Sequence, residues 1–182
     1  MERQHLLENW LKAQFPGKIF TLQPASADAS FRRYFRIFLD SKTWIVMDAP
    51  PQQEDCKPFL QVANMLAATG VHVPKVWSYD LAQGFLLLSD LGHTTYLQIL
   101  TQEDDQANQL YSDATDALVK IQLSSQAPNL PDYDETLLRR ELNLFPDWYI
   151  AKHLQADLST KQKAMLENIF NQILQNNLAQ PR

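Results

Sequence analysis

The sequence predicts an α+β fold in which a mostly antiparallel sheet, crossed by one helix, precedes an all-helical half. Up to about residue 92 the apolar residues alternate as in strands and are separated by turn residues. From residue 94 onward they recur at helical spacing instead. The change in periodicity places a boundary at Ser89–Gly92, where a sheet-containing part meets a helical part.

The pattern predicts the elements of the first part in order. They are a helix of about twelve residues around Leu6–Phe15 that ends at Pro16-Gly17, strands at Ile19–Leu22, Tyr34–Leu39 and Thr43–Asp48, a helix over Phe59–Leu66 that ends at Thr69-Gly70, and strands at Val76–Tyr79 and Phe85–Leu88. The second part is expected to contain helices at Tyr96–Leu100, Asp105–Leu123, Asp134–His153 and Thr160–Leu178.

Composition excludes several classes of partner. The net charge of −5 argues against a general nucleic-acid or anionic-membrane binder, because such partners select a basic surface. A single cysteine, Cys56, forms no internal disulfide and no zinc site by itself, which is typical of a reducing compartment. No apolar run approaches the roughly 18 residues of a membrane span, and the N-terminus lacks a signal-peptide pattern. We therefore expect a cytoplasmic protein with neither nucleic acid nor membrane as partner.

The segment Ser26–Ile37, SADASFRRYFRI, is the first candidate binding site. Its small residues allow backbone N–H groups to approach phosphate oxygens, and a guanidinium fork suits bidentate contact with such oxygens. Taken alone, the segment is equally an ordinary polar hairpin whose arginines form a solvated face. Its neighbours along the chain decide between the two interpretations.

A second candidate is Ser89-Asp90-Leu91-Gly92, which follows the apolar strand Phe85–Leu88. As a lone tetrapeptide it indicates only a strand end with an aspartate turn. Because it joins the two parts of the chain, it also lies where a slot for a ligand is expected to form.

Four stretches together resemble the aminoglycoside-phosphotransferase-like kinases, and more narrowly the bacterial sugar kinases that phosphorylate N-acetylmuramate and N-acetylglucosamine at the anomeric hydroxyl. They are SADASFRRYFRI, IVMDAPPQQEDC, GVHVPKVWSYDLAQGFLLLSDLG and YDETLLRRELNLFPDWYIAKHL. The resemblance implies a protein-kinase-like fold with a nucleotide-binding N-lobe at 1–88, a hinge at 89–93 and a partial helical C-lobe at 94–182. It also implies an ATP- and magnesium-dependent amino-sugar kinase of peptidoglycan recycling.

The resemblance further assigns roles to individual residues. Those expected to contact the nucleotide are the loop residues Ser26, Ala27, Asp28, Ala29, Ser30, Arg32 and Arg33, then Met47 in the third strand, Leu88 beside the hinge, and the hinge residues Ser89, Asp90 and Leu91. Arg140 and Glu141 are expected to border the acceptor sugar, although they equally suit a salt-bridged helix face. Glu54 or Asp55 lies where such kinases keep the acid that pairs with a strand lysine.

The sequence departs from the wider kinase pattern in two ways. The third strand, Ile45-Val46-Met47-Asp48, has no lysine to orient phosphates, so Arg32 or Arg33 is expected to replace it. In addition, no His-x-Asp segment exists among the 182 residues, and neither catalytic residues nor metal ligands are assigned. We therefore expect a truncated chain that is inactive alone.

Two alternatives remain open at this point. The chain is either the nucleotide-binding portion of a kinase or a non-catalytic nucleotide-binding or interaction remnant. The truncation is also expected to leave apolar helical faces in the second part without a neighbour, which predicts either poor stability of that part or self-association through it. An antibiotic-modifying phosphotransferase is less consistent with the sequence, which does not show the many acidic residues that such a cationic substrate normally meets in the later C-lobe.

Overall fold

The computed structural model describes residues 2–27, 30–102, 104–124 and 130–180. Its contacts divide the chain into two units, Met1–Gln126 and Ala127–Arg182, and each is described by itself. None of the helices in the described ranges has the length and apolarity needed to cross a membrane. The lobe boundaries drawn from the sequence at 88 and 94 remain predictions.

Unit 1 contains a five-stranded antiparallel sheet with the strand order β1-β2-β3-β5-β4. Its elements are α1 (Glu2–Gln14), β1 (Thr21–Ala27), β2 (Arg33–Leu39), β3 (Lys42–Asp48), α2 (Lys57–Ala68), β4 (Val76–Asp80), β5 (Phe85–Ser89), α3 (Tyr96–Gln102), the 3₁₀ helix η1 (Asp104–Gln106) and α4 (Ala107–Ser124). The predicted α+β class and the order of elements are confirmed.

The bounds expected for the first strand were wrong. Ile19 lies outside β1 and is 92% exposed, whereas the strand continues through Ser26 to Ala27, which pairs with Arg33. β1 is an edge strand, where Pro24, a residue without an N–H, is tolerated. The pairing with β2 becomes irregular between Pro24 and Ser26.

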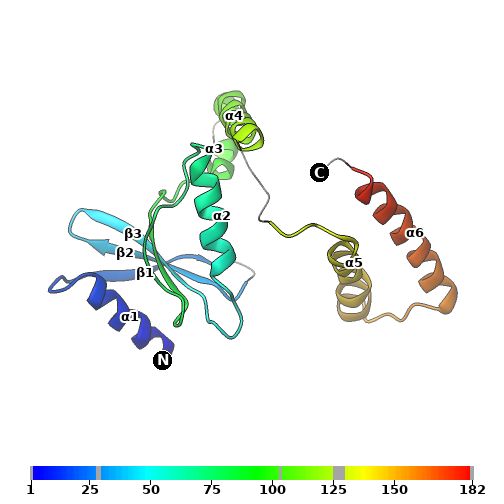
Figure 1. The fold of residues 1–182 in the computed structure, drawn as a ribbon, viewed down its shortest axis with the longest axis horizontal. Coiled ribbons are helices and arrows are strands. Elements are labelled where there is room, and N and C mark those ends of the chain that lie inside the picture. Colours follow the sequence, from blue (N-terminus) through cyan, green and yellow to red (C-terminus); the bar gives the residue numbers. More distant parts are fainter. Residues whose placement is uncertain (1, 28–29, 103, 125–129, 181–182) are drawn as a thin grey trace. The chain divides into compact units, whose positions relative to one another are not determined.

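Helices α1 and α2 lie on different sides of the sheet (Figure 1). Each helix packs on a separate apolar cluster. We call these two sides of the sheet the α1 face and the α2 face. The α1 face buries Leu7, Trp10 and Leu11 of the helix against Ile37, Val46, Phe85 and Leu87 of the strands. The α2 face contains Met47, Ala49, Cys56, Leu86 and Leu88, with Phe59 and Leu60 of the helix packed against them. Strand residues alternate between the two clusters because successive side chains point to opposite faces.

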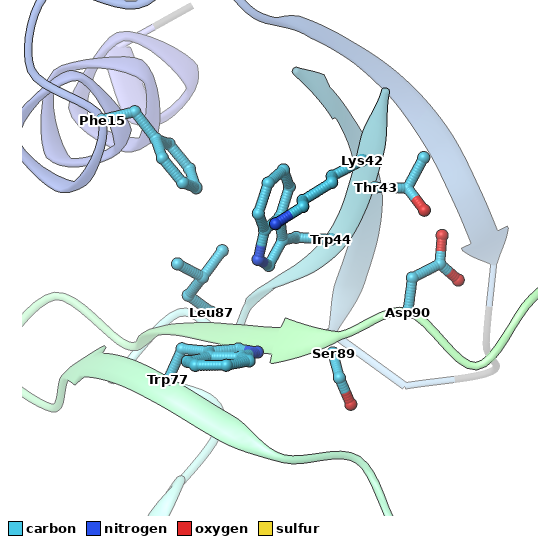
Figure 2. Close-up of a pocket in the computed structure, with 8 residues that line it drawn as sticks. All are labelled: Phe15, Lys42, Thr43, Trp44, Trp77, Leu87, Ser89 and Asp90. Atoms are coloured by element: carbon cyan, nitrogen blue, oxygen red, sulfur yellow. The ribbon is translucent and has the colours of Figure 1, made fainter. Parts of the chain in front are cut away.

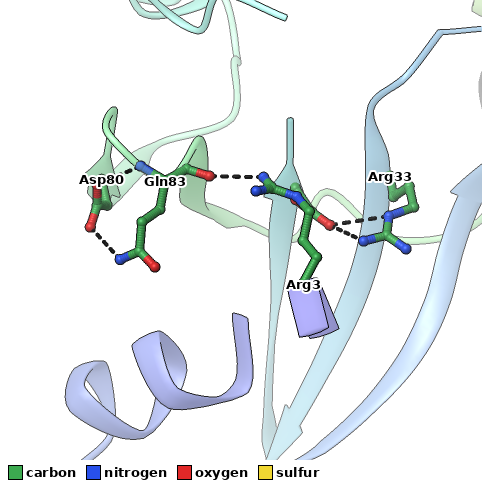
Figure 3. A network of polar contacts seen from close by, with 5 residues as sticks. Arg3, Arg33, Asp80 and Gln83 are labelled. Atoms are coloured by element: carbon green, nitrogen blue, oxygen red, sulfur yellow. Dashed lines mark hydrogen bonds and ion pairs between the residues drawn. The ribbon is translucent and has the colours of Figure 1, made fainter. Parts of the chain in front are cut away.

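Asp48, the last residue of β3, is fully buried on the α1 face and is held by two arginines. The Nε of Arg3 donates to its Oδ1 at 2.7 Å, and the Nε of Arg33 donates to its Oδ2 at 3.1 Å. Arg3 also donates from Nη2 to the carbonyl of Gln83 at 2.8 Å (Figure 3). One carboxylate thus connects α1, β2, β3 and the β4–β5 turn.

The β4–β5 turn approaches the end of β3 closely at Gly84. The Ala49 N–H donates to the Gly84 carbonyl at 2.8 Å, and Gly84 has a φ of +71°. A Cβ at this position would lie 1.8 Å from the Ala49 carbonyl oxygen. Both the positive φ and the close backbone approach therefore require glycine.

Unit 2 is a helical hairpin of α5 (Glu135–Leu144), the π-helix η2 (Phe145–His153) and α6 (Thr160–Leu178). The Asp134 side chain caps α5, and Ser159 with Gln162 forms a capping box on α6. The single kinked helix expected at Asp134–His153 changes from α to π at Phe145, next to Pro146, which cannot donate the regular backbone hydrogen bond.

We predict that Asp48→Asn lowers the free energy of unfolding by about 3 kcal/mol, because two guanidinium groups lose the anion that neutralises them in a buried site. Urea unfolding followed by circular dichroism measures the change. Asp40→Asn is the matched control, since Asp40 forms an exposed ion pair with Lys18 at 3.2 Å and its loss costs less than about 1 kcal/mol. Equal costs for the two variants would contradict the role given to Asp48.

Candidate functional site

The α2 face brings together three of the residues that the sequence assigned to nucleotide binding. Met47 and Leu88 are buried in one apolar cluster on neighbouring strands, since Met47 pairs with Leu86 and Ile45 with Leu88 across β3 and β5. Arg32 lies at the start of β2 and contacts Glu54 beside α2. An apolar surface and a guanidinium therefore share one side of the sheet.

Of the two acids before α2, Glu54 and not Asp55 pairs with Arg32. The Nε of Arg32 donates to the Oε2 of Glu54 at 3.0 Å, and both side chains are mostly buried. Asp55 instead accepts the Lys57 N–H at 2.9 Å, just before α2. Desolvation lowers the pKa of Arg32, but its hydrogen bonds and charge interactions with Glu54 and Tyr34 outweigh this and raise the pKa overall. The guanidinium therefore stays charged.

Arg33 is separated from Arg32 by the alternation of the strand. Its side chain lies on the α1 face, where it donates to the buried carboxylate of Asp48. The other side of this guanidinium is open, since the side chain is 51% exposed. A phosphate contact by Arg33 remains a prediction, and the structure does not bring it together with Met47 and Leu88.

The predicted phosphate loop is only partly within the described residues. Ser26 and Ala27 end β1 and pair with Tyr34 and Arg33. Ser30 is exposed, and its Oγ accepts the Arg32 N–H at 3.2 Å, which orders the chain just before β2. Asp28 and Ala29 lie outside the described residues.

At the hinge, Ser89 is tied to the chain that enters β4. Its N–H donates to the Lys75 carbonyl at 2.9 Å, and its Oγ accepts the Lys75 N–H at 2.9 Å. The next residue, Asp90, uses its carboxylate rather than only its backbone. It accepts from Arg36 of β2, with Nε to Oδ2 at 2.6 Å and Nη2 to Oδ1 at 3.1 Å. The hinge is thus fastened to β4 and to β2.

Sequence reasoning missed Arg36. The alternation of β2 could have shown on which face Arg36 lies. Its neighbours Phe35 and Ile37 pack against α1, so Arg36 lies on the α2 face of the sheet. Hydrogen bonding to Arg36 lowers the pKa of Asp90, and bonds from the Gly92 N–H and Thr43 add to this against the opposing effect of burial. The hydrogen bond to Asp90 likewise raises the pKa of Arg36. Both groups are therefore ionised at neutral pH.

A cavity of about 580 Å³ lies beside the hinge, but it does not include Met47 or Leu88 (Figure 2). Its lining residues are Phe15, Lys42, Thr43, Trp44, Trp77, Leu87, Ser89 and Asp90. Phe15, Trp44 and Trp77 contribute aromatic rings to its walls, and the ring centroids of Phe15 and Trp44 are 5.2 Å apart. A smaller cavity of about 360 Å³ on the other side contains Arg32 and the apolar residues of α2, including Phe59, Val62 and Leu66.

The residues predicted to border the acceptor sugar lie in unit 2. The Arg140 Nη2 donates to the Glu141 Oε1 at 3.4 Å, and both side chains are exposed. Arg139 instead links α5 to α6, since it donates to Glu167 and to Asn171 at 2.6 Å each. Arg140 and Glu141 are therefore not required to hold the hairpin, and sugar binding by them remains a prediction.

Acidic clusters that suit a metal are not found in the part of the chain that the structure describes. No group of three or more His, Cys, Asp or Glu side chains there is placed to hold a metal ion.

We predict that Asp90→Asn lowers the free energy of unfolding at pH about 7 and that this difference vanishes in acid. The Asp90 carboxyl has a lower pKa in the folded state than its ordinary pKa of 3.8. Its contribution to the stability of the fold is therefore fully present above pH 3.8, and it is lost as the pH falls through the pKa of the folded state. Urea unfolding of both proteins across this range measures the difference. A difference that is independent of pH would contradict an ionic role for Asp90.

Residues 21–182 match the phosphotransferase enzyme family. The chain is 52% identical over 161 residues to the N-acetylmuramate/N-acetylglucosamine kinase of Pseudomonas aeruginosa, covering 88% of this chain and 47% of that protein. It is 46% identical over 162 residues to the kinase of the same name from Pseudomonas putida, covering 89% of this chain and 47% of that protein. The corresponding kinase of Neisseria meningitidis serogroup B is 40% identical over 185 residues, covering 100% of this chain and 55% of that protein.

The chain thus spans about half the length of the curated relatives it matches. Its antiparallel sheet followed by helices agrees with a kinase-like N-lobe and the start of a helical C-lobe. On both grounds, the chain belongs to the phosphotransferase enzyme family.

Proposed function

We propose that these 182 residues form the nucleotide-binding portion of an ATP-dependent kinase that phosphorylates an amino sugar such as N-acetylmuramate or N-acetylglucosamine. The names and the identity of the relatives support the substrate class. The observation that carries the proposal is the α2 face, on which Arg32, Met47 and Leu88 share one side of the sheet next to the hinge. Peptidoglycan recycling in the cytoplasm is the corresponding cellular role.

The proposed nucleotide lies against the α2 face. Met47 and Leu88 supply an apolar surface for the base, and the hinge backbone meets its polar edge. Arg32 takes the place of the absent strand lysine, because its ion pair with Glu54 resembles the lysine–glutamate pair that orients phosphates in protein kinases. Arg33, held by Asp48 on the α1 face, contributes a second positive charge to the loop.

Magnesium belongs to the proposal because phosphoryl transfer in kinases of this kind uses it to neutralise the phosphates. The acids of the described ranges form no cluster that fits the ion, so no step is assigned to it. Arg140 and Glu141, exposed and free of structural contacts between helices, are proposed to donate to and accept from sugar hydroxyls.

Transfer of the phosphoryl group is not assigned to any residue. The sequence contains no His-x-Asp segment, which in this fold supplies the aspartate that orients the acceptor hydroxyl. We therefore propose that the 182 residues bind nucleotide but do not catalyse.

We predict that ATP raises the thermal unfolding midpoint of this chain in a concentration-dependent way, by preferential binding to the folded state. Arg32→Met is expected to weaken the effect by removing a phosphate contact. Arg139→Met is the matched control, because Arg139 pairs within unit 2. No shift at millimolar ATP would contradict nucleotide binding.

The same preparations, assayed with ATP, magnesium and N-acetylmuramate, are expected to show no turnover. Repeated turnover by the 182-residue chain would contradict the proposal that catalysis needs residues it does not contain.

A second candidate function, an interaction module, is favoured by one feature of unit 2. Helix α6 buries Phe170 and Leu174 but exposes a parallel stripe, in which Met165 is 58%, Ile169 46% and Ile173 38% exposed. Such a stripe at i, i+4 and i+8 is typical of a surface that pairs with another apolar face.

For this candidate we predict concentration-dependent self-association in sedimentation velocity. Ile169→Glu is expected to abolish it, since a charge would be buried in the contact. Lys163→Glu, an exposed change on the same helix, is the control. A monomer at all concentrations would exclude self-association through this stripe.

A further inference from the structure

The hinge after β5 has no strand partners of its own, yet its backbone is held in one conformation. The carboxylate of Asp90 accepts two hydrogen bonds from Arg36, and its Oδ1 also accepts the Gly92 N–H at 2.9 Å. The Arg36 Nη2 donates in addition to the Gly92 carbonyl at 2.8 Å. Both polar backbone groups of Gly92 are thereby satisfied, and its φ of +95° is one that glycine adopts without strain.

The pair is well shielded from water. The side chain of Asp90 is 7% exposed and that of Arg36 is 17% exposed, so the ionic contact is screened much less than a surface salt bridge. The contact joins residues 54 positions apart, from the middle of β2 to the end of the sheet. It therefore fixes the hinge relative to the sheet rather than only within its own turn.

Hydrogen bonds therefore hold the hinge on both sides of Leu91. Ser89 is bonded to Lys75 before it, and Gly92 is bonded to Arg36 and Asp90 after it. Leu91 lies between them with a side chain that is 51% exposed. Within the described residues, no hydrogen bond engages the backbone N–H or carbonyl of Leu91.

We propose that Arg36 and Asp90 are positioning residues that hold the Leu91 peptide ready to recognise the polar edge of a bound adenine. A peptide N–H and carbonyl complement the ring-nitrogen acceptor and amino donor that adenine presents along one edge. Holding them in place beforehand lowers the entropy cost of binding. This inference rests on the proposed nucleotide-binding function.

The chemistry explains why arginine is needed at position 36. Its planar guanidinium reaches both oxygens of Asp90 and the Gly92 carbonyl at the same time. A lysine retains the charge but presents a single ammonium, which cannot reproduce this fork. Arg36→Lys is therefore the most selective perturbation, and Asp90→Asn, which keeps the size of the side chain, is the second variant.

The test separates base recognition from phosphate recognition. Isothermal titration of the 182-residue chain with adenosine and with inorganic tripolyphosphate measures the two affinities below the unfolding temperature of every variant. We expect Arg36→Lys and Asp90→Asn to weaken adenosine binding about tenfold, the equivalent of one charge-assisted hydrogen bond, and to leave tripolyphosphate binding unchanged. Arg32→Met is expected to give the opposite pattern.

Arg139→Lys is the matched control, because it makes the same substitution at an arginine of unit 2 that also bonds to two residues, here through the side chains of Glu167 and Asn171. It is expected to bind both probes as the unsubstituted chain does. Equal losses for adenosine and tripolyphosphate in both hinge variants would overturn the inference, since they would indicate general loosening of the fold. Unchanged adenosine affinity in both folded variants would overturn it as well.

The outcome for the unsubstituted chain distinguishes the two proposals. If that chain binds neither adenosine nor tripolyphosphate, the proposed function fails and the inference fails with it. If it binds both and the hinge variants bind adenosine equally well, only the positioning role is overturned.

Discussion

The burial of one carboxylate, Asp48, is the constraint on which much of unit 1 depends. A fully buried anion needs compensating charge, and Asp48 receives it from Arg3 and Arg33. The hydrogen bond from Arg3 to Asp48 holds α1 against the sheet. Arg3 also donates to the Gln83 carbonyl in the β4–β5 turn. The same turn presses on the end of β3 at Gly84, so a single charged site connects most elements of the sheet at one end.

This network also decides which arginine is available to the α2 face. Arg33 is drawn to Asp48, while Arg32, one residue earlier, points the other way and pairs with Glu54. The third strand has methionine where other kinases have a lysine. The proposed positive charge near the phosphates comes instead from Arg32, just before β2. The proposed role of Arg32 follows from the side of the strand on which it lies and from its partner.

Much of the fold was predictable because periodicity is a local property. The order of helices and strands, the hairpin of β2 and β3, and the bounds of α6 agree with the pattern of apolar residues. The first strand was misplaced because the small residues from Ala25 onward look like a loop, and only the pairing with β2 at the sheet edge shows otherwise. The π-helix at Phe145 was anticipated only as a kink next to Pro146.

By itself, the sequence determined the α+β class, the order of the elements and the resemblance that the family match confirmed, since these depend on local spacing and on motifs in a row. Tertiary structure alone decided the partners: Asp48 with Arg3 across 45 positions, Arg32 with Glu54, and Arg36 with the hinge. Alternation along a strand predicts the face on which a side chain lies, but only the folded chain shows which distant charged residue it pairs with there.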